Sequence, residues 1–297
     1  MFHNSVLLEE SINALEIIPD GIYVDATFGG GGHSKEILKK LKNGKLFAFD
    51  QDEDALVNKI EDDRLVLIHN NFRYLRNFLK LYKTVPVDGI LADLGISSYQ
   101  IDHPERGFST RFSGELDMRM NRDKKISAKD IVNQYTEEKL KAVFREYGEL
   151  RNAGKIAQLI VTARKTSTIN TTTELKEALI AAAERGKENK FFAQVFQALR
   201  IEVNQELDAL REFLIQATDV LKEGGRLVVI SYHSLEDKLV KDYFRSGNFE
   251  GILEKDFYGN PIIPLSVINR KAIVPGEKEI TQNSRARSAR LRVAVKI

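Results

Sequence analysis

Four consecutive glycines stand between a short apolar run that contains Asp25 and the polar His33-Ser34, in VDATFGGGGHS (Val24–Ser34). Glycine adopts positive φ without strain and lets a ligand approach the backbone closely. The helix expected after the glycines offers free N–H groups and a positive potential at its first turn. A tight turn without a ligand would not need four glycines, because each one adds to the entropic cost of folding. The run therefore predicts a ligand-binding loop.

An acidic residue, Asp50, ends the next apolar run, about 20 residues beyond the glycines. A carboxylate at such a position accepts hydrogen bonds from the two ribose hydroxyls of a nucleoside. The alternative is that Asp50 caps the following helix. The glycine loop and Asp50 together favour a nucleoside cofactor more strongly than either does alone.

These two features fit both a nicotinamide dinucleotide and S-adenosylmethionine. Gly29 and Gly31 match the start of the dinucleotide fingerprint, but Ser34 stands where that fingerprint requires Gly or Ala. Asp25, which precedes the glycines, would repel a pyrophosphate. The same carboxylate would suit the cationic methionine end of S-adenosylmethionine, directly or through a water. The charge of Asp25 therefore favours the methyl donor.

A further carboxylate, Asp93, ends the fourth apolar run, in ADLGISS. In an open parallel sheet, ligands lie outside the carboxyl ends of the strands, so we expect Asp93 beside the cofactor. Methyl transfer to an aromatic amine needs in-line geometry and an acceptor that draws an N–H aside, which frees the nitrogen lone pair from conjugation. Asp93 suits this task; the alternative is that it caps a turn.

Four more candidates follow expected strands. Phe72 could pack on adenine, although an aromatic residue there is more often part of the core. Gln100 could contact the cofactor or lie on the surface. Tyr232 and His233, in SYHSLED, could stack on a flipped base. The competing interpretation of that segment is a helix cap formed by Ser234–Asp237.

The elements that position these residues alternate between short apolar runs and helical stretches of about ten residues, as in βαβ units of a parallel sheet buried on both faces. The pattern stops after Gly95. Residues 97–125 are polar and irregular, and helix follows to about Asn204. The α/β pattern then returns, and Leu291–Ile297 alternates apolar and basic residues like an outer antiparallel strand. The expected strands are Ile22–Phe28, Leu46–Asp50, Leu65–His69, Val87–Leu94 and Arg226–Ser231, and the expected helices around them are His33–Leu41, a segment from Glu53, Phe72–Tyr82, Asn204–Leu221 (ended by Gly224-Gly225) and Ser234–Phe244.

This organisation predicts an α/β fold in which a Rossmann-like sheet domain, residues 1–104 and 203–297, carries an inserted all-helical domain, residues 105–202. We assign substrate recognition to the insert. Ser127 with Asp130 and Thr171 with Glu174 fit the start signal of a helix. Two helical stripes support the insert: Leu140, Val143, Phe144 and Tyr147, and Ile156, Leu159, Ile160 and Ala163.

The composition, with 42% hydrophobic and 30% charged residues, is that of a globular protein. We expect a cytoplasmic protein, because no apolar run approaches the roughly 20 residues of a membrane helix, no signal peptide is evident and cysteine is absent. Five scattered histidines predict no metal site. The net charge of +2 means that RNA binding would need a local basic face. Two arginine clusters could supply one: Arg106, Arg111, Arg119 and Arg122, and Arg285, Arg287, Arg290 and Arg292.

The whole chain resembles the bacterial small-subunit rRNA (cytosine-N4-)-methyltransferase family, known as RsmH or MraW. The ordered motifs that carry the resemblance are HNSVLLEE, VDATFGGGGHS, ADLGISSYQ, RGFSTR, LDMRM, FQALRIEVNQEL, GGRLVVISYHSLED and NSRARSARLR. The resemblance implies a class I methyltransferase sheet, S-adenosylmethionine as methyl donor and a cytidine of the decoding centre in 16S rRNA as target. One departure is the unbroken glycine run, which relatives often interrupt with Arg or Lys. The implied cofactor contacts are Gly31, Gly32, His33, Asp50, Phe72, Asp93 and Gln100.

On this basis we expect an SN2 transfer to the exocyclic N4 of cytidine, in which Asp93 orients the amine and Tyr232 or His233 holds the base. Three alternatives remain: an oxidoreductase with a nicotinamide cofactor, a methyltransferase for DNA or a small molecule, and a non-enzymatic RNA-binding assembly factor. DNA amino-methylating enzymes often carry Asn/Asp-Pro-Pro-aromatic where this chain has Asp93-Leu94-Gly95-Ile96. The oligomeric state stays open, with a homodimer among the alternatives.

Overall fold

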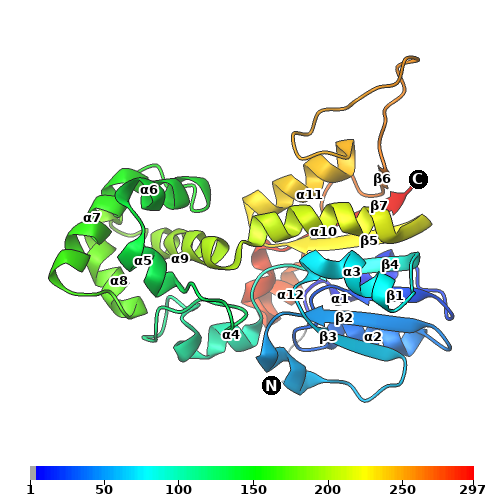
Figure 1. Cartoon of the computed structure of the whole chain (residues 1–297), viewed down its shortest axis with the longest axis horizontal. Coiled ribbons are helices and arrows are strands. Elements are labelled where there is room, and N and C mark those ends of the chain that lie inside the picture. Colours follow the sequence, from blue (N-terminus) through cyan, green and yellow to red (C-terminus); the bar gives the residue numbers. More distant parts are fainter. Residues whose placement is uncertain (1–4) are drawn as a thin grey trace. The chain divides into compact units, whose positions relative to one another are not determined.

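The computed structural model describes residues 5–297, so the first two residues of the HNSVLLEE motif lie outside the described part. The chain forms two compact units: unit 2 is Ile96–Glu206, and unit 1 comprises the chain up to Gly95 together with Leu207–Ile297 (Figure 1). Unit 2 begins earlier than the predicted insert because residues before 105 pack within it. The backbone at Pro104, for example, leaves no room for a Cβ at Gly114.

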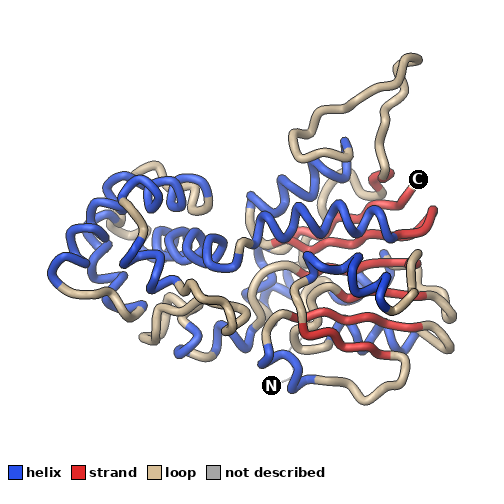
Figure 2. Tube along the Cα trace, in the orientation of Figure 1, coloured by secondary structure: helices blue, strands red, loops and turns tan. Residues whose placement is uncertain are grey.

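Unit 1 is built on one sheet of seven strands in the order β3-β2-β1-β4-β5-β7-β6 (Figure 2). The five strands from β3 to β5 are parallel, and β7 is antiparallel to β5 and to β6. The predicted Rossmann-like sheet is therefore confirmed. Its strand order reverses between β1 and β4, the place where open α/β sheets bind ligands. The strands are β1 Ile22–Asp25, β2 Lys45–Asp50, β3 Leu65–His69, β4 Val87–Asp93, β5 Leu221–Ser231, β6 Leu265–Val267 and β7 Arg290–Lys296.

Helices cover both faces of this sheet. Side chains of α1 and α2 form one buried cluster with β1, β2 and β5, and α3 packs on the other face, where Phe78 meets Phe49 edge to face at 5.9 Å. Figure 1 shows α10 and α11 on the same face as α3. The helices of unit 1 are α1 Leu8–Ala14, α2 Gly32–Lys40, α3 Leu75–Leu81, α10 Glu206–Val220, α11 Ser234–Ser246 and α12 Glu277–Gln282, with 3₁₀ turns η1 Glu53–Asn58, η2 Phe72–Tyr74 and η5 Ser284–Ser288.

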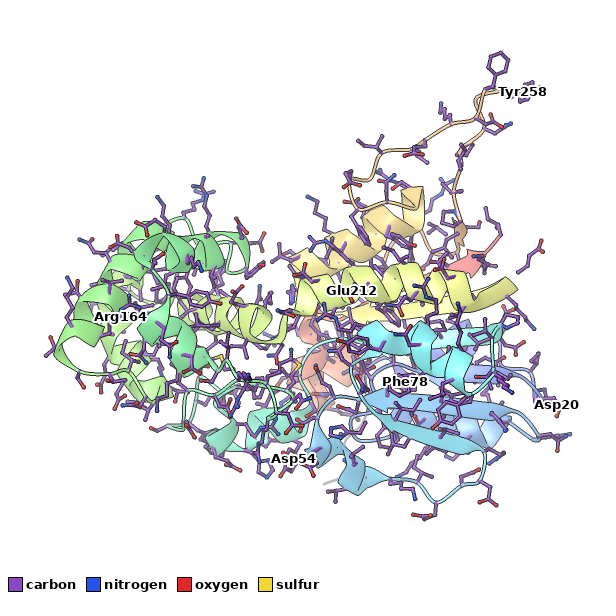
Figure 3. All side chains as sticks on the ribbon, in the orientation of Figure 1. Asp20, Asp54, Phe78, Arg164, Glu212 and Tyr258 are labelled. Atoms are coloured by element: carbon purple, nitrogen blue, oxygen red, sulfur yellow. The ribbon has the colours of Figure 1, made fainter. Side chains whose placement is uncertain are left out.

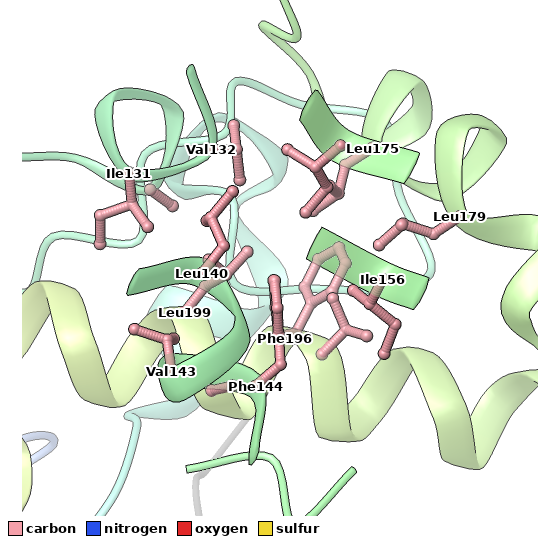
Figure 4. Packing of buried hydrophobic residues seen from close by; sticks show 14 of the residues in the cluster. Ile131, Val132, Leu140, Val143, Phe144, Ile156, Leu175, Leu179, Phe196 and Leu199 are labelled. Carbon is pink, nitrogen blue, oxygen red and sulfur yellow. The ribbon is translucent and has the colours of Figure 1, made fainter. Parts of the chain in front are cut away.

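Unit 2 is helical and has its own hydrophobic core (Figure 4). The predicted start signals are confirmed, because Ser127 with Asp130 and Thr171 with Glu174 form capping boxes. Both predicted stripes contribute to the core through side chains such as Leu140, Phe144 and Ile156. Its helices are α4 Ser98–Asp102, α5 Ala128–Gln134, α6 Glu137–Glu146, α7 Ala153–Thr166, α8 Thr172–Leu179 and α9 Glu188–Asn204, with 3₁₀ turns η3 Pro104–Arg106 and η4 Ile180–Ala182.

The structure corrects several expected boundaries. Leu291–Ile297 was expected at the edge of the sheet, but β7 lies between β5 and the short β6. Phe72–Tyr82 divides into η2 and α3 rather than forming one helix. Asn204 ends α9 instead of starting α10, because Gln205 has a left-handed conformation with φ 53°. The glycines at 224 and 225 lie within β5, four residues beyond the helix end at Val220.

Within residues 5–297, no helix combines the length and apolar character that crossing a membrane requires.

Candidate active site

The glycine loop connects β1 to α2 at the carboxyl edge of the sheet. Gly29 and Gly31 have φ values of +52° and +73°, in the left-handed region that favours glycine. Gly31 is the N-cap of α2, so the first N–H groups of that helix have no acceptor in a preceding turn. A Cβ on Gly30 would meet no other atom within 4 Å, so this side of the loop is open.

Asp25 lies beneath this loop, with no exposed surface. Its carboxylate accepts a hydrogen bond from the Ser34 hydroxyl at 2.7 Å and another from the backbone N–H of Thr27 at 3.1 Å. Burial raises the pKa of Asp25 to about 6. The direct contact with a cofactor considered above is therefore not what this arrangement offers. The carboxylate instead fixes the start of α2 and the entry into the glycine loop.

Replacing Ser34 with alanine should destabilise the protein more at pH 8 than at pH 5. A hydrogen bond to a charged group contributes about 1.5–3 kcal/mol, and the bond from Ser34 favours the ionised form of Asp25, since it lowers the pKa of that carboxyl. Because the folded pKa of Asp25 is raised to about 6, the folded state binds more protons than the unfolded state between pH 4 and 6. The free energy of unfolding of the wild-type protein therefore decreases as pH rises through that window, because buried Asp25 loses its proton there.

Urea unfolding of wild type and Ser34→Ala at the two pH values measures this difference. Asp25→Asn is the control, because an amide cannot titrate and the pH-dependent part of the Ser34 effect should vanish. If Ser34→Ala lowers the unfolding free energy equally at both pH values in a protein that keeps Asp25, Ser34 does not act through the ionised carboxylate of Asp25.

Asp50 organises the opposite side of the loop from the end of β2. Its Oδ2 accepts the Gly29 N–H and its Oδ1 accepts the Asp52 N–H, both at 2.8 Å. Burial raises its pKa to about 6. The helix following β2 is capped by Asp52 rather than by Asp50. A carboxylate has about four lone-pair sites, so Asp50 retains acceptor capacity for other donors such as ribose hydroxyls.

Phe72 opens η2 directly after β3 and is half-buried. Its ring packs edge to face on the buried Phe213 of α10, with centroids 5.2 Å apart. Phe72 therefore makes a core contact and keeps part of its surface exposed, so a role in the core and a contact with adenine are compatible.

Asp93 lies at the end of β4, next to the end of β1. Its backbone N–H donates to Thr27 Oγ1 at 2.7 Å, and its Oδ1 accepts the Tyr232 hydroxyl at 2.8 Å. Burial raises the pKa of Asp93 to about 6, and it raises the pKa of Tyr232 well above its ordinary value. Tyr232 is thus a neutral donor that orients a carboxylate whose side chain is 22% exposed. Sequence inspection had overlooked Thr27, although it stands inside the glycine motif.

The other oxygen of Asp93 faces His33. Oδ2 lies 3.9 Å from His33 Nδ1, while His33 Nε2 is 3.2 Å from the carbonyl oxygen of Val6. Because a carbonyl only accepts, Nε2 carries a proton, and burial lowers the pKa of this imidazole, which favours its neutral form. Nδ1 and Oδ2 are then two acceptors across a short gap. A group with N–H or O–H bonds is the complementary partner for that gap.

His233 has a different position from the one expected of a base-stacking residue. It is the N-cap of α11, and its Nδ1 accepts the Glu236 N–H at 3.4 Å. Glu236 in turn accepts the Tyr232 N–H at 2.9 Å. The cap therefore starts one residue before the predicted Ser234–Asp237 pair. Glu236, which sequence inspection missed, holds the turn that presents Tyr232.

Gln100 belongs to unit 2, where it is buried and forms a capping box with Ser97 at the start of α4. Its amide oxygen accepts the Ser97 N–H at 3.0 Å.

The arginine clusters divide into buried and exposed members. Arg106 is 1% exposed and donates to carbonyl groups of residues 119 and 120, and Arg292 is 8% exposed and paired with Asp237 at 2.7 Å. The expectation that these two contact phosphates is wrong, because both side chains are enclosed. Arg119 is largely committed to Asp117 and to backbone carbonyls. The exposed members are Arg111, Arg122, Arg285, Arg287 and Arg290.

Comparison with known proteins matches the whole chain, residues 1–297, to the model of the MraW methylase family. The chain belongs to the MraW methylase family. Family membership confirms the resemblance drawn from the motifs and confirms S-adenosylmethionine as the methyl donor of this methylase. It also removes the nicotinamide-dependent oxidoreductase from the alternatives.

Relatives are similar over nearly their full lengths. A protein of Christiangramia forsetii is 58% identical over 297 residues, covering 100% of this chain and 98% of the relative. One of Flavobacterium johnsoniae is 57% identical with the same coverage, and one of Bacteroides fragilis is 54% identical over 296 residues, covering 99% and 97%. Each of the three is named ribosomal RNA small subunit methyltransferase H.

The residues of unit 1 fit a nucleoside methyl donor. The loop is open over Gly30, Asp50 retains acceptor sites at the end of the neighbouring strand, and Phe72 presents a partly exposed ring. The start of α2 suits an anionic group such as a carboxylate, because its N–H groups and dipole favour negative charge.

Proposed function

We propose that this member of the MraW methylase family methylates the exocyclic N4 of one cytidine in 16S rRNA, at the decoding centre of the small subunit. The observation that carries the rRNA substrate is the 54–58% identity, over almost the full chain, with methyltransferases named for small-subunit rRNA. The cytidine, its N4 atom and the decoding centre come from the motif resemblance.

The geometry of Asp93 supports an amine as the acceptor of the methyl group. S-adenosylmethionine supplies an electrophilic methyl on sulfur. Asp93 Oδ2 faces His33 Nδ1 at 3.9 Å, and the two acceptors would receive an N–H of the amine and hold it in one orientation. Accepting that N–H draws it aside and leaves the nitrogen lone pair directed at the methyl. Positioning of this kind contributes most where the leaving group is already activated.

The proton balance needs no strong base. As the N–C bond forms and the C–S bond breaks, the amine nitrogen becomes cationic and acidic. Its proton leaves to Asp93 or to water, and a carboxyl with a pKa of about 6 returns that proton to solvent near neutral pH. Tyr232 keeps Oδ1 occupied, so Oδ2 is the oxygen directed at the amine.

Cofactor contacts are proposed for Gly31, Gly32, His33, Asp50, Phe72 and Asp93, all in unit 1. A cofactor contact of Gln100 stays a prediction from the motif resemblance. Asp25 supports the loop from below rather than touching the ligand. For the target base we retain Tyr232 as the candidate contact. His233, which caps α11, supports Tyr232 through the turn instead. The helical unit 2 is proposed to recognise the substrate. Exposed arginines such as Arg285 and Arg287 would neutralise phosphates, so RNA affinity should fall with salt.

The decisive experiment is mass mapping of methylated nucleosides in rRNA from cells that lack the gene. We expect one N4-methylcytidine of 16S rRNA to disappear and to return with the wild-type gene but not with Asp93→Ala. Loss of a different modification, or full methylation in the deletion strain, would refute the proposal. A cytoplasmic location and a homodimer stay predictions, which cell fractionation and light scattering address.

A further inference from the structure

Residues 250–263, between α11 and β6, form a projecting arm of unit 1. Figure 1 shows this segment extending away from the sheet, and Figure 3 shows Tyr258 near its end. Every residue from Ile252 to Ile262 is exposed. Phe257 is 97% exposed and Tyr258 is 85% exposed, and each ring contacts the other edge to face at 5.6 Å. Adjoining exposed apolar side chains, unlike single ones, mark sites of interaction with another molecule.

The tip of the arm is ordered by its own hydrogen bonds. The N–H of Asp256 donates to Asn260 O at 2.9 Å, and that of Ile262 donates to Glu254 O at 2.9 Å. The Asp256 carboxylate accepts the N–H groups of Tyr258 and Asn260 at 2.9 and 2.8 Å. The arm thus holds its aromatic pair ready in one conformation, which lowers the entropic cost of binding.

The charge of the arm argues against RNA as its partner. It carries the exposed Glu250 and Glu254, the acidic Asp256 and one cation, Lys255, which gives a formal net charge of −2. Phosphates are bound by clusters of Lys and Arg, and carboxylates repel them. Further apolar side chains flank the pair, with Ile252 65% and Ile262 58% exposed. An apolar, acidic surface complements an apolar pocket with a basic rim.

We propose that the arm docks on a basic protein component of the small ribosomal subunit, inserting Phe257 and Tyr258 into an apolar pocket. This inference rests on the proposed function and deepens it, because it adds a protein contact to a substrate otherwise described by its RNA. Aromatic anchors in a desolvated pocket dominate the energetics of most protein interfaces, and a rim of opposite charge steers the encounter.

The first test is the double variant Phe257→Ser/Tyr258→Ser, titrated against intact small subunits and against protein-free 16S rRNA. Affinity for subunits should fall about tenfold or more, as expected on removing interface anchors. Affinity for free rRNA, affinity for S-adenosylhomocysteine and the unfolding midpoint should stay unchanged, because the two side chains pack on no core. Leu81→Ser, which removes a 72% exposed side chain at the end of α3, is the matched control.

The second test reverses charge in Glu250→Lys/Glu254→Lys. A basic protein partner predicts weaker binding to subunits, whereas an RNA partner predicts tighter binding to both subunits and free rRNA. Tighter binding, an equal loss on free rRNA in the serine variant, or no loss on subunits would each overturn the inference.

Measuring both binding and methylation of subunits, with the wild-type protein and with the serine variant, separates this inference from the proposed function. If the wild-type protein binds subunits through the arm but does not methylate them, the proposed function is refuted and the docking role of the arm is not. Subunits that are methylated normally by the serine variant, with unchanged KM, would refute the arm alone.

Discussion

Asp93→Ala should lower the methyl-transfer rate on the order of 10²-fold or more while the protein stays folded, as found when a preorganised electrostatic group at a reacting centre is removed. The Asp93 backbone N–H donates to the Thr27 hydroxyl oxygen, and the Asp93 carboxylate accepts the Tyr232 hydroxyl at Oδ1. Its Oδ2 is directed toward His33. Alanine removes the acceptor for the amine N–H without disturbing either neighbouring strand.

The measurement is methyl incorporation into small subunits at saturating donor, with S-adenosylhomocysteine affinity determined by calorimetry. Near-normal turnover with intact cofactor affinity would refute the role of Asp93. The pH profile supplies a second readout. Because the pKa of Asp93 is about 6, the acceptor form is lost as pH falls through that value, so kcat should decrease there. Asp93→Asn should retain a little activity and lose this acidic limb.

Tyr232→Phe is the matched control: it tests the orientation of the Asp93 carboxylate while leaving its charge in place. It preserves the ring, which packs near Gly95, and removes only the O–H that donates to Asp93. A hydrogen bond to a charged group contributes about 1.5–3 kcal/mol, so we expect a loss of roughly tenfold, smaller than that of Asp93→Ala. A loss as large as that of Asp93→Ala would mean that the Tyr232 hydroxyl does more than orient the Asp93 carboxylate.

The strand ends could be predicted from the sequence because each signal is local. β3 has the expected bounds, Leu65–His69, and β2 ends at Asp50 as expected. β1 ends at Asp25, before the expected Phe28, and β4 ends at Asp93, one residue before the expected Leu94. A near-continuous apolar run followed by a polar residue identifies the carboxyl end of a buried parallel strand. Such runs place three carboxylates along one edge before any contact is known.

The hydrogen-bond partners of Asp93 could not be predicted, because they are distant in sequence. Thr27 and Asp93 are 66 residues apart, and Tyr232 and Asp93 are 139 apart. Asp25 resembles a ligand contact in the sequence, yet Ser34 and the loop enclose it. Only the fold distinguishes a carboxylate below the loop from one beside it.

The sequence also does not show which arginines are exposed and which are paired with an acidic residue. NSRARSARLR looks like a solvated basic segment, but β7 carries Arg292 into contact with Asp237, 55 residues earlier in the chain. The spacing of arginines along a segment does not show which of them have an acidic partner. The three-residue β6 was missed for another reason, since a strand that short has no measurable periodicity.

Asp50→Ala should weaken S-adenosylhomocysteine binding by on the order of 10²-fold, because two or more hydrogen bonds to a charged acceptor are lost together. Asp50 accepts the N–H groups of Gly29 and Asp52, so it orders the glycine loop as well as presenting its remaining lone pairs. Calorimetry measures the affinity. Glu53→Ala, which removes an exposed carboxylate three residues on, is the matched control and should bind normally.

A deoxyribose analogue separates the direct contact from loop ordering. If Asp50 accepts a ribose hydroxyl, removing the 2′-hydroxyl weakens binding to the wild type but not further to Asp50→Ala, so the double-mutant cycle gives a coupling energy. Independent, additive losses would leave Asp50 with loop ordering alone. The pH dependence has a fixed sign in either case. Since burial raises the pKa of Asp50 to about 6, wild-type affinity should decline as pH falls through that value, and Asp50→Asn should flatten the decline.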